Sequence, residues 1–125
     1  MSEFNFKSQI CTTREQSERL LSLGLKKETA DMCWIPLTDG RCVLGVSTEI
    51  RLDTIPAWSL HRLIEMMPKT IGRYFQYTSN DSCGYMDEDA LNMNGGFDEG
   101  NIYDSIISCI EWLIKKGYFP KEYLV

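Results

Sequence analysis

The order of apolar and polar positions predicts two helices in the first third of the sequence. Thr12 and Thr13 each precede a Glu or Gln by three residues, which is the capping-box pattern of a helix N-terminus. Gly24 suits the end of this helix, and residues 25–34 predict a second short helix that Pro36 terminates. Together these segments predict a helix–turn–helix unit.

The pattern changes to a period of two between residues 41 and 52, which indicates a strand with one apolar face. This stretch is longer than an ordinary strand of about 5–6 residues. Either Gly45 bends one long strand, or two strands meet near Val46 and Ser47.

A further short helix is predicted after Ser59, which is a good N-cap residue. Trp58 and Leu63 are spaced as a hydrophobic staple around that cap, and Pro68 ends the helix. The segment is therefore predicted to form a helix of about two turns with one apolar side.

The next segments predict strands. Residues 74–78 and 83–86 flank a turn-rich sequence at 79–81, as in an antiparallel pair. Residues 90–93 are a candidate further strand, whereas the glycine-rich residues 92–101 predict a loop or turn.

The C-terminal helix has the strongest pattern. Asn101 is its predicted N-cap, and Gly117 lies where a left-handed residue ends a helix. We expect this amphipathic helix to pack across the sheet, so that substitution of Ile110 by Asp unfolds the domain. Its apolar stripe consists of Ile102, Tyr103, Ile106, Ile107, Ile110, Leu113 and Ile114.

These elements predict an α+β fold in a single domain over residues 1–125, with an antiparallel sheet of about 4–5 strands packed against the helices. The length of 125 residues, with 43% apolar and 25% charged residues, is typical of one globular domain. No stretch has the roughly 18 apolar residues that a membrane span needs. Because the sequence shows no secretory signal and no Cys-x-x-Cys pair, we expect reduced thiols and a cytoplasmic location.

The net charge of −5 is unevenly distributed. Residues 74–114 contain eight acidic side chains and no Lys or Arg. Since phosphate contacts come mainly from Lys and Arg, this block argues against a nucleic-acid surface, and it is equally compatible with a basic partner or a metal ion. The acids that we expect to face such a partner are Asp87, Glu88, Asp89, Asp98 and Glu99.

The candidate catalytic residues are few. His61 is the single histidine, and Glu65 follows it by one helical turn. Cys83, which follows a polar turn, or Cys33 would have to approach His61 to form a thiol-dependent enzyme. No family-specific motif surrounds these residues, so an exposed helical histidine and structural cysteines are the more ordinary interpretation.

No cofactor or metal is predicted. The paired Cys or His ligands of zinc sites are absent, and Asp87–Asp89 lacks the glycine that a calcium loop needs for its sharp turn. Residues 94–100 are glycine-rich without the Gly-Lys-Ser/Thr ending of a phosphate loop. For the predicted helix–turn–helix unit, structural packing is favoured over DNA binding, because Glu28 and Asp31 would face a polyanion.

Large aromatic side chains are plentiful and allow two interpretations. They crowd one surface and bind a partner, or they fill the core and leave their polar ends in water. The residues concerned are Trp58, Tyr74, Tyr77, Tyr85 and Tyr103.

Three segments, residues 11–32, 56–60 and 112–118, taken together resemble a family of short uncharacterised proteins from gut bacteria and their mobile elements. The resemblance covers most of the chain and is weakest over residues 74–100. It implies a stand-alone intracellular domain with a mobile-element or phage context, and it implies no catalytic or binding residue.

We therefore expect a small acidic protein that acts as a non-catalytic interaction or accessory module. Its binding surface is predicted to combine the acidic segment 87–99 with the aromatic group near Trp58. The alternatives are a thiol-dependent enzyme that uses His61 and a small-ligand-binding domain with a pocket of Tyr and Met side chains. A homo-oligomer is compatible with each of these.

Overall fold

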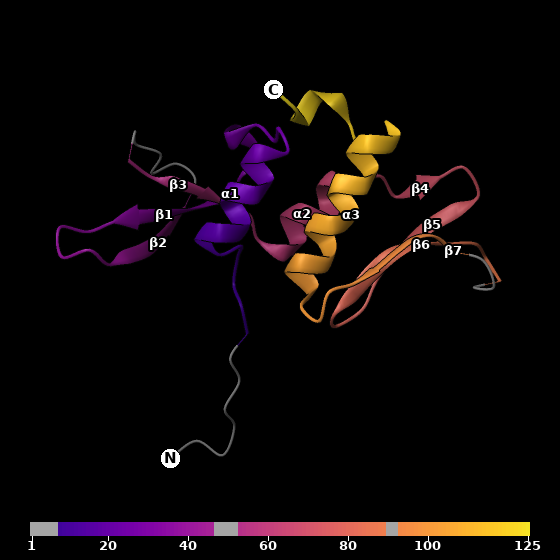
Figure 1. Cartoon of the computed structure of the whole chain (residues 1–125), viewed down its shortest axis with the longest axis horizontal. Helices are drawn as coiled ribbons and strands as arrows, with labels where there is room; N and C mark the ends of the chain where they lie inside the picture. The colour runs from indigo at the N-terminus through magenta and orange to yellow at the C-terminus, as the bar shows by residue number, and fades with distance from the viewer. Residues whose placement is uncertain (1–7, 47–52, 90–92) are drawn as a thin grey trace, which may run out of the picture.

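The computed structural model describes residues 8–46, 53–89 and 93–125, and within them it places three α-helices and two antiparallel sheets (Figure 1). The strand orders are β2-β1-β3 and β4-β5-β6-β7. The predicted α+β class is confirmed, with the strands divided between two sheets. In chain order the elements are α1 (Arg14–Ser22), η1 (Lys27–Thr29), β1 (Met32–Pro36), β2 (Cys42–Val46), β3 (Ile55–Ala57), α2 (Leu60–Met66), β4 (Thr70–Ile71), β5 (Tyr74–Thr78), β6 (Ser82–Met86), β7 (Met93–Asp98), α3 (Ile102–Lys116) and η3 (Lys121–Tyr123).

The helices lie between the two sheets (Figure 1). One hydrophobic cluster joins the three helices to the four-stranded sheet, with Leu20 of α1, Leu63 of α2, Tyr85 of β6 and Ile110 of α3 all fully buried in it. The chain forms a single small domain around this cluster. Among the residues that the structure describes, none of the helices combines the length and the hydrophobicity needed to cross a membrane.

Helix α1 begins as the sequence predicts. Thr13 is the N-cap, and its Oγ1 accepts a hydrogen bond from the Gln16 backbone N at 3.1 Å. The Gln16 side chain accepts one in return from the Thr13 backbone N at 2.9 Å, which completes the capping box. Thr12 is buried instead, and its hydroxyl accepts from the Trp58 backbone N at 3.1 Å.

The predicted second helix over residues 25–34 is wrong. Only the short turn η1 forms there, and the apolar residues that follow enter β1 at the centre of the three-stranded sheet. A strand forms because β1 pairs on both sides, with β2 and with β3, so its backbone groups find partners along two edges. The predicted helix–turn–helix unit therefore does not exist.

The strand expected over residues 41–52 is present as β2 as far as Val46. Residues 47–52 lie outside the described residues, so the choice between one bent strand and two strands stays open. Helix α2 follows its predicted N-cap, since the Ser59 hydroxyl accepts a hydrogen bond from the Arg62 backbone N at 3.2 Å.

The predicted hairpin is confirmed as β5 and β6, but the loop expected over residues 92–101 is wrong. Residues 93–98 form β7, which pairs with β6. Gly95 has a φ of +82°, and the register between β6 and β7 shifts nearby, so this strand contains an irregularity that glycine accommodates. Of the candidate strand 90–93, only Met93 lies within the described residues, and it begins β7.

Helix α3 has the predicted caps. The side chain of Asn101 accepts from the backbone N of Tyr103 and of Asp104, at 2.9 and 3.2 Å. Gly117 closes the helix with a φ of +79°. The helix packs against β6 and β7, where Trp112 lies 6.0 Å from the ring of Phe97. Helix α3 therefore covers one face of the four-stranded sheet.

Candidate functional site

The side of the four-stranded sheet opposite α3 carries large apolar side chains. Residues alternate between two faces along a strand, and paired residues share a face. Phe75 of β5 pairs with Met86, which pairs with Met93 of β7. The next row on the same side contains Tyr77, Gly84 and Gly96. We call this surface the outer sheet face and define it by Phe75, Tyr77, Gly84, Met86, Met93 and Gly96.

The opposite side of the same strands faces the core. Cys83 and Tyr85 of β6 are fully buried, and the Gln76 side chain donates to the Ile64 carbonyl of α2 at 3.4 Å. An antiparallel sheet covered on one side usually presents polar residues on its free side. Here Phe75 is 47% exposed and Met93 is 52% exposed, directly across Met86 from each other. An exposed apolar row at this place suits contact with another molecule.

A hollow of about 460 Å³ lies on the outer sheet face beside Tyr77. Met93 and Gly96 line it from β7, and Asp98 and Ser82 line it at the end of the β6–β7 pair. We call it the Tyr77 hollow. It is open to solvent, so it is a place for a protruding side chain rather than an enclosed ligand cavity.

The predicted acidic residues do not form one patch. Asp87, Glu88 and Asp89 follow β6 at the end where Met86 pairs with Met93. Asp98 and Glu99 lie at the other end, where Ser82 pairs with Asp98. Four residues of strand separate the two groups, which is about 13 Å. The acids therefore flank the outer sheet face at both ends.

The two groups have different surroundings. At the first end, Arg73 lies 5.3 Å over the ring of Tyr74, within electrostatic reach of Asp87. At the second end, Asp98 is exposed, while Glu99 accepts a hydrogen bond from the Ser108 hydroxyl at 3.4 Å and so turns toward α3. Asp98, in the second group, is therefore the acid that lies beside the Tyr77 hollow.

Two further acids of the cation-free block have partners within the protein. Glu111 of α3 lies 3.2 Å from Arg19 of α1 and 3.6 Å from Lys115. Asp104 accepts a hydrogen bond from the Gln16 side chain at 2.8 Å. The contacts of Glu111 with Arg19 and of Asp104 with Gln16 join α1 to α3, so part of the negative charge serves the fold. Asp98, which lines the Tyr77 hollow, is the strongest candidate for contact with a partner.

The aromatic group predicted near Trp58 is largely core. Trp58 is fully buried, and its indole N–H donates to the Thr29 hydroxyl at 2.9 Å. Tyr85 is also fully buried and donates to the Pro68 carbonyl at 2.6 Å. Tyr103 donates to a backbone carbonyl in the same way, at 3.2 Å. Tyr74 packs against the core cluster, and Tyr77 alone of the predicted group belongs to the outer sheet face.

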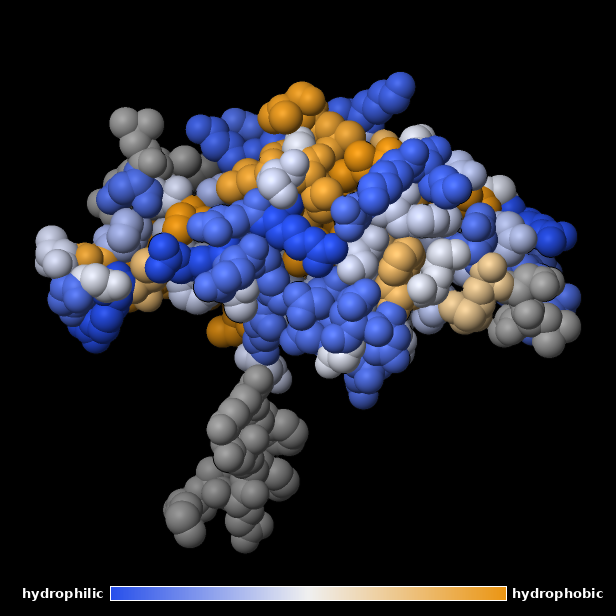
Figure 2. Space-filling view, viewed as in Figure 1, coloured by the Kyte–Doolittle hydropathy of each residue, from blue (hydrophilic) through white to orange (hydrophobic). Residues whose placement is uncertain are grey.

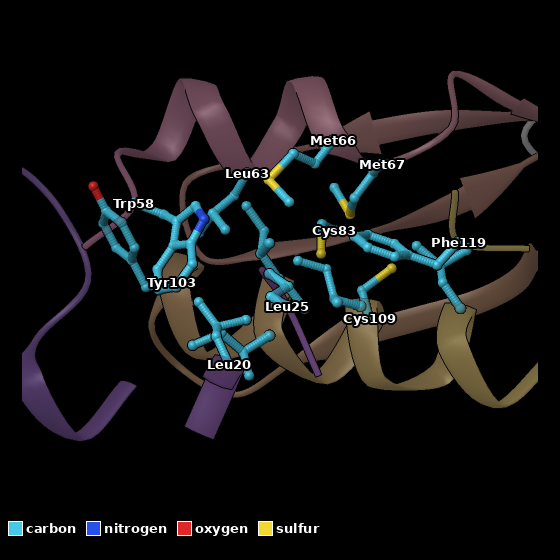
Figure 3. Close-up of a cluster of buried hydrophobic side chains, with 14 of the residues drawn as sticks. Leu20, Leu25, Trp58, Leu63, Met66, Met67, Cys83, Tyr103, Cys109 and Phe119 are labelled. Atoms are coloured by element: carbon cyan, nitrogen blue, oxygen red, sulfur yellow. The ribbon is translucent and has the colours of Figure 1, made fainter. Parts of the chain in front are cut away.

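The predicted catalytic residues are not brought together. His61 and Glu65 are exposed on α2, and Glu65 lies 3.8 Å from Arg62 in a surface ion pair. Leu63 and Met66 occupy the opposite side of that helix and point into the core that contains Cys83 (Figure 3). Cys33 is fully buried as well. Because Cys83 and Cys33 are buried while His61 is exposed, this arrangement does not support the thiol-enzyme alternative.

Thiol labelling of the native protein is expected to separate one cysteine from the other four. Cys42 is partly exposed, whereas Cys11, Cys33, Cys83 and Cys109 are buried. Burial, with a smaller effect of the Asp31 charge, raises the pKa of the Cys11 thiol to about 11. A hydrogen bond with Cys83, followed by burial, raises the pKa of Cys109. Because the thiolate is the nucleophile and burial requires opening first, we expect maleimide to modify Cys42 at least about tenfold faster than the rest.

Mass spectrometry of the labelled peptides would measure these rates, with the urea-unfolded chain as the control in which all five thiols react alike. Rapid native labelling of Cys83 or Cys33 would contradict the buried assignment and restore the enzyme alternative.

Other apolar surfaces are less organised as sites. A hollow of about 260 Å³ beside β1 and β2 is lined by Ile10, Trp34 and Leu44. The strongest apolar colour in Figure 2 lies where the C-terminal segment packs beside α1, and the last residue, Val125, is 92% exposed there. Within residues 8–46, 53–89 and 93–125, no group of three His, Cys, Asp or Glu side chains is placed to hold a metal ion. Of these described surfaces, the outer sheet face alone combines an apolar row, a hollow and flanking acids.

Phe75, Met86 and Met93 are functional candidates that the sequence pattern does not single out. Alternation within residues 74–78 places Phe75 and Tyr77 on one side of a strand, but the pattern leaves open which side a helix covers.

Comparison with protein-family models, with curated proteins and with solved structures found no match to this chain.

Proposed function

We propose that this protein is a non-catalytic interaction module that docks a protein partner on its outer sheet face. The observation that carries the proposal is the cross-strand row of Phe75, Met86 and Met93, in which Phe75 and Met93 are exposed on a sheet face that would ordinarily be polar. The partner is a protein segment that contributes an apolar anchor to this row and basic residues to its acidic ends.

The apolar row supplies affinity. Docking removes the exposed parts of Phe75 and Met93 from water, and truncation of such anchors at interface centres typically weakens binding by more than about 1 kcal/mol each. Met side chains also adapt their shape to a contacting surface. These properties favour a peptide or protein surface over a rigid small ligand.

The partner lies on the face of the sheet and does not extend its edge. β7 is one edge strand of this sheet, and β4, with only 2 residues, is the other. A peptide added at β7 would need a continuous row of backbone donors and acceptors. Gly95 has a φ of +82° in this strand, and the register with β6 shifts beside it. The irregular edge therefore opposes strand addition.

The charges specify the sign of the partner. Residues 74–114 contribute acids and no Lys or Arg, and acids lie at both ends of the outer sheet face. A basic partner is attracted to this arrangement, while a phosphate backbone is repelled.

Selection of binding peptides from a random-peptide phage library tests the proposal. We expect enrichment of peptides that combine apolar and basic residues, and loss of their binding by at least about tenfold when Phe75→Ser and Met93→Ser are combined. Because both side chains are half exposed, the melting temperature is expected to change by only a few degrees.

Val43→Ser is the matched control, since Val43 is 44% exposed on the other sheet. This variant should bind the selected peptides as the parent does. Undiminished binding by the Phe75→Ser/Met93→Ser protein, or loss of binding in Val43→Ser alone, would contradict the proposal.

A further inference from the structure

We propose that the Tyr77 hollow receives an arginine side chain of the docked partner segment. The inference rests on the proposed function and names the residue type that the outer sheet face selects. The hollow combines an aromatic ring, a glycine floor, a thioether and a carboxylate, contributed by Tyr77, Gly96, Met93 and Asp98.

Glycines keep the floor of the hollow low. A Cβ at Gly84 would lie 3.0 Å from Cε1 of Tyr77, and a Cβ at Gly96 would lie 2.5 Å from Cε of Met93. The Tyr77 ring and the Met93 thioether thus rest on glycine backbone, with the hollow between them. The methylene stem of a long basic side chain packs on such apolar surface while its charged end stays polar.

Asp98 supplies the negative charge. Its Oδ1 accepts a hydrogen bond from the Gly100 backbone N at 3.1 Å, which orients the carboxylate. In the described part of the chain, none of the ion pairs involves Asp98. Asp98 and Tyr77 both line the hollow. Burial first, and then the charges of Cys83, Cys109 and Asp98, raise the pKa of the Tyr77 hydroxyl.

The geometry favours arginine over lysine. A guanidinium group is planar, stacks on an aromatic ring and donates two parallel hydrogen bonds to a carboxylate. Tyr77 and Asp98 line the same hollow and offer these two contacts together. A lysine ammonium gains the charge interaction without the stacked plane.

The sheet also sets the spacing within the partner. Asp98 pairs with Ser82, and Met93 pairs with Met86, four residues further along β6. An extended segment that reaches both places therefore carries its arginine and its apolar anchor about 13 Å apart, which is about four positions.

Short synthetic peptides labelled with fluorescein test the inference by anisotropy on the intact protein. Each contains one Arg and one Leu about four positions apart in a Ser/Thr background. Matched peptides carry Lys or the neutral isostere citrulline in place of Arg, or have Leu moved next to Arg. We expect the Arg peptide to bind about tenfold more tightly than the citrulline peptide and about threefold more tightly than the Lys peptide.

Three variants separate charge from shape. Asp98→Asn is expected to abolish the preference for Arg over citrulline. Glu99→Gln removes the same charge from the next residue, whose carboxylate turns toward α3, and should retain the preference. Gly96→Ala narrows the hollow while displacing only the flexible end of Met93, so it should weaken Arg binding without unfolding the protein.

Equal binding of the Arg and citrulline peptides by the parent protein would overturn the inference, as would no detectable binding of the Arg peptide at concentrations up to about 1 mM. If Phe75→Ser/Met93→Ser then still abolishes binding of the selected phage peptides, the proposed function stands without this inference. If that double variant binds them as the parent does, both fail.

Discussion

Substitution of Ile110 by Asp is expected to leave the chain unfolded at room temperature. Ile110 is fully buried in the middle of α3, within the cluster that joins all three helices to β6. Removing its side chain alone costs about 2–5 kcal/mol. A carboxylate at this place adds a desolvation penalty of several kcal/mol more. A domain of this size has a free energy of unfolding of about 5–15 kcal/mol, so the two costs together are comparable with the whole stability.

Circular dichroism during thermal unfolding measures the effect. The matched control is Ile10→Asp, the same substitution at a residue that is 66% exposed, and it should melt close to the parent. A cooperative transition of Ile110→Asp at the parental temperature would show that α3 does not form the core.

Substitution of Gly84 by Ala is expected to destabilise the fold by about 2–3 kcal/mol, near the upper limit for overpacking. A Cβ at Gly84 would lie 2.2 Å from the carbonyl oxygen of Gly95 and 2.8 Å from Cα of Gly96. Both obstacles are backbone of the neighbouring strand, so β6 and β7 must separate for the methyl group to fit. Urea unfolding followed by fluorescence measures the loss.

Gly45→Ala provides the comparison within the other sheet. Its added Cβ meets the end of the Ile35 side chain at 2.6 Å, and this flexible atom is able to move away. Alanine also loses less conformational entropy than glycine on folding. We expect a change of less than about 1 kcal/mol for Gly45→Ala. If Gly84→Ala were equally mild, the close approach of β6 and β7 would be wrong.

Local capping and amphipathic periodicity determine the elements that the sequence predicts well. Thr13 and Asn101 begin α1 and α3 through their own side chains, and such signals are readable without knowledge of the rest of the fold. By local sequence alone, residues 25–34 also predict a helix, although in the structure they form η1 and enter β1. Pairing of β1 with both β2 and β3 decides that segment, and this pairing involves residues distant in sequence.

The candidate site is predictable only in part, for the same reason. The absence of Lys and Arg from residues 74–114 is a property of the sequence alone, and it indicates a basic partner. Which aromatic residues face outward depends on which side of the sheet α3 covers. Tyr85 of β6 therefore lies in the core, while Phe75 and Met93, which no sequence pattern distinguishes, form the exposed row. Trp58, which lies outside this sheet between β3 and α2, is buried as well.

The Gly-rich sequence of β7 shows a further limit. Glycines ordinarily indicate a loop, and residues 92–101 are predicted as one on that ground. In the structure, Gly95 lies beneath the Trp112 ring, which a Cβ would approach to 2.9 Å, and Gly96 forms part of the floor of the Tyr77 hollow. These glycines allow close packing within a strand, which the sequence does not distinguish from a turn.

Chemical-shift mapping of backbone amides tests the central claim most directly. The isotope-labelled protein would be titrated with the strongest peptide from the phage selection. We predict that the largest shifts occur at residues of β5, β6 and β7, including Tyr77, Gly84, Met86 and Gly96, and that Phe75→Ser/Met93→Ser removes them. Shifts centred on Ile10, Trp34 and Leu44, beside the hollow of the other sheet, would contradict the assignment of the outer sheet face as the docking surface.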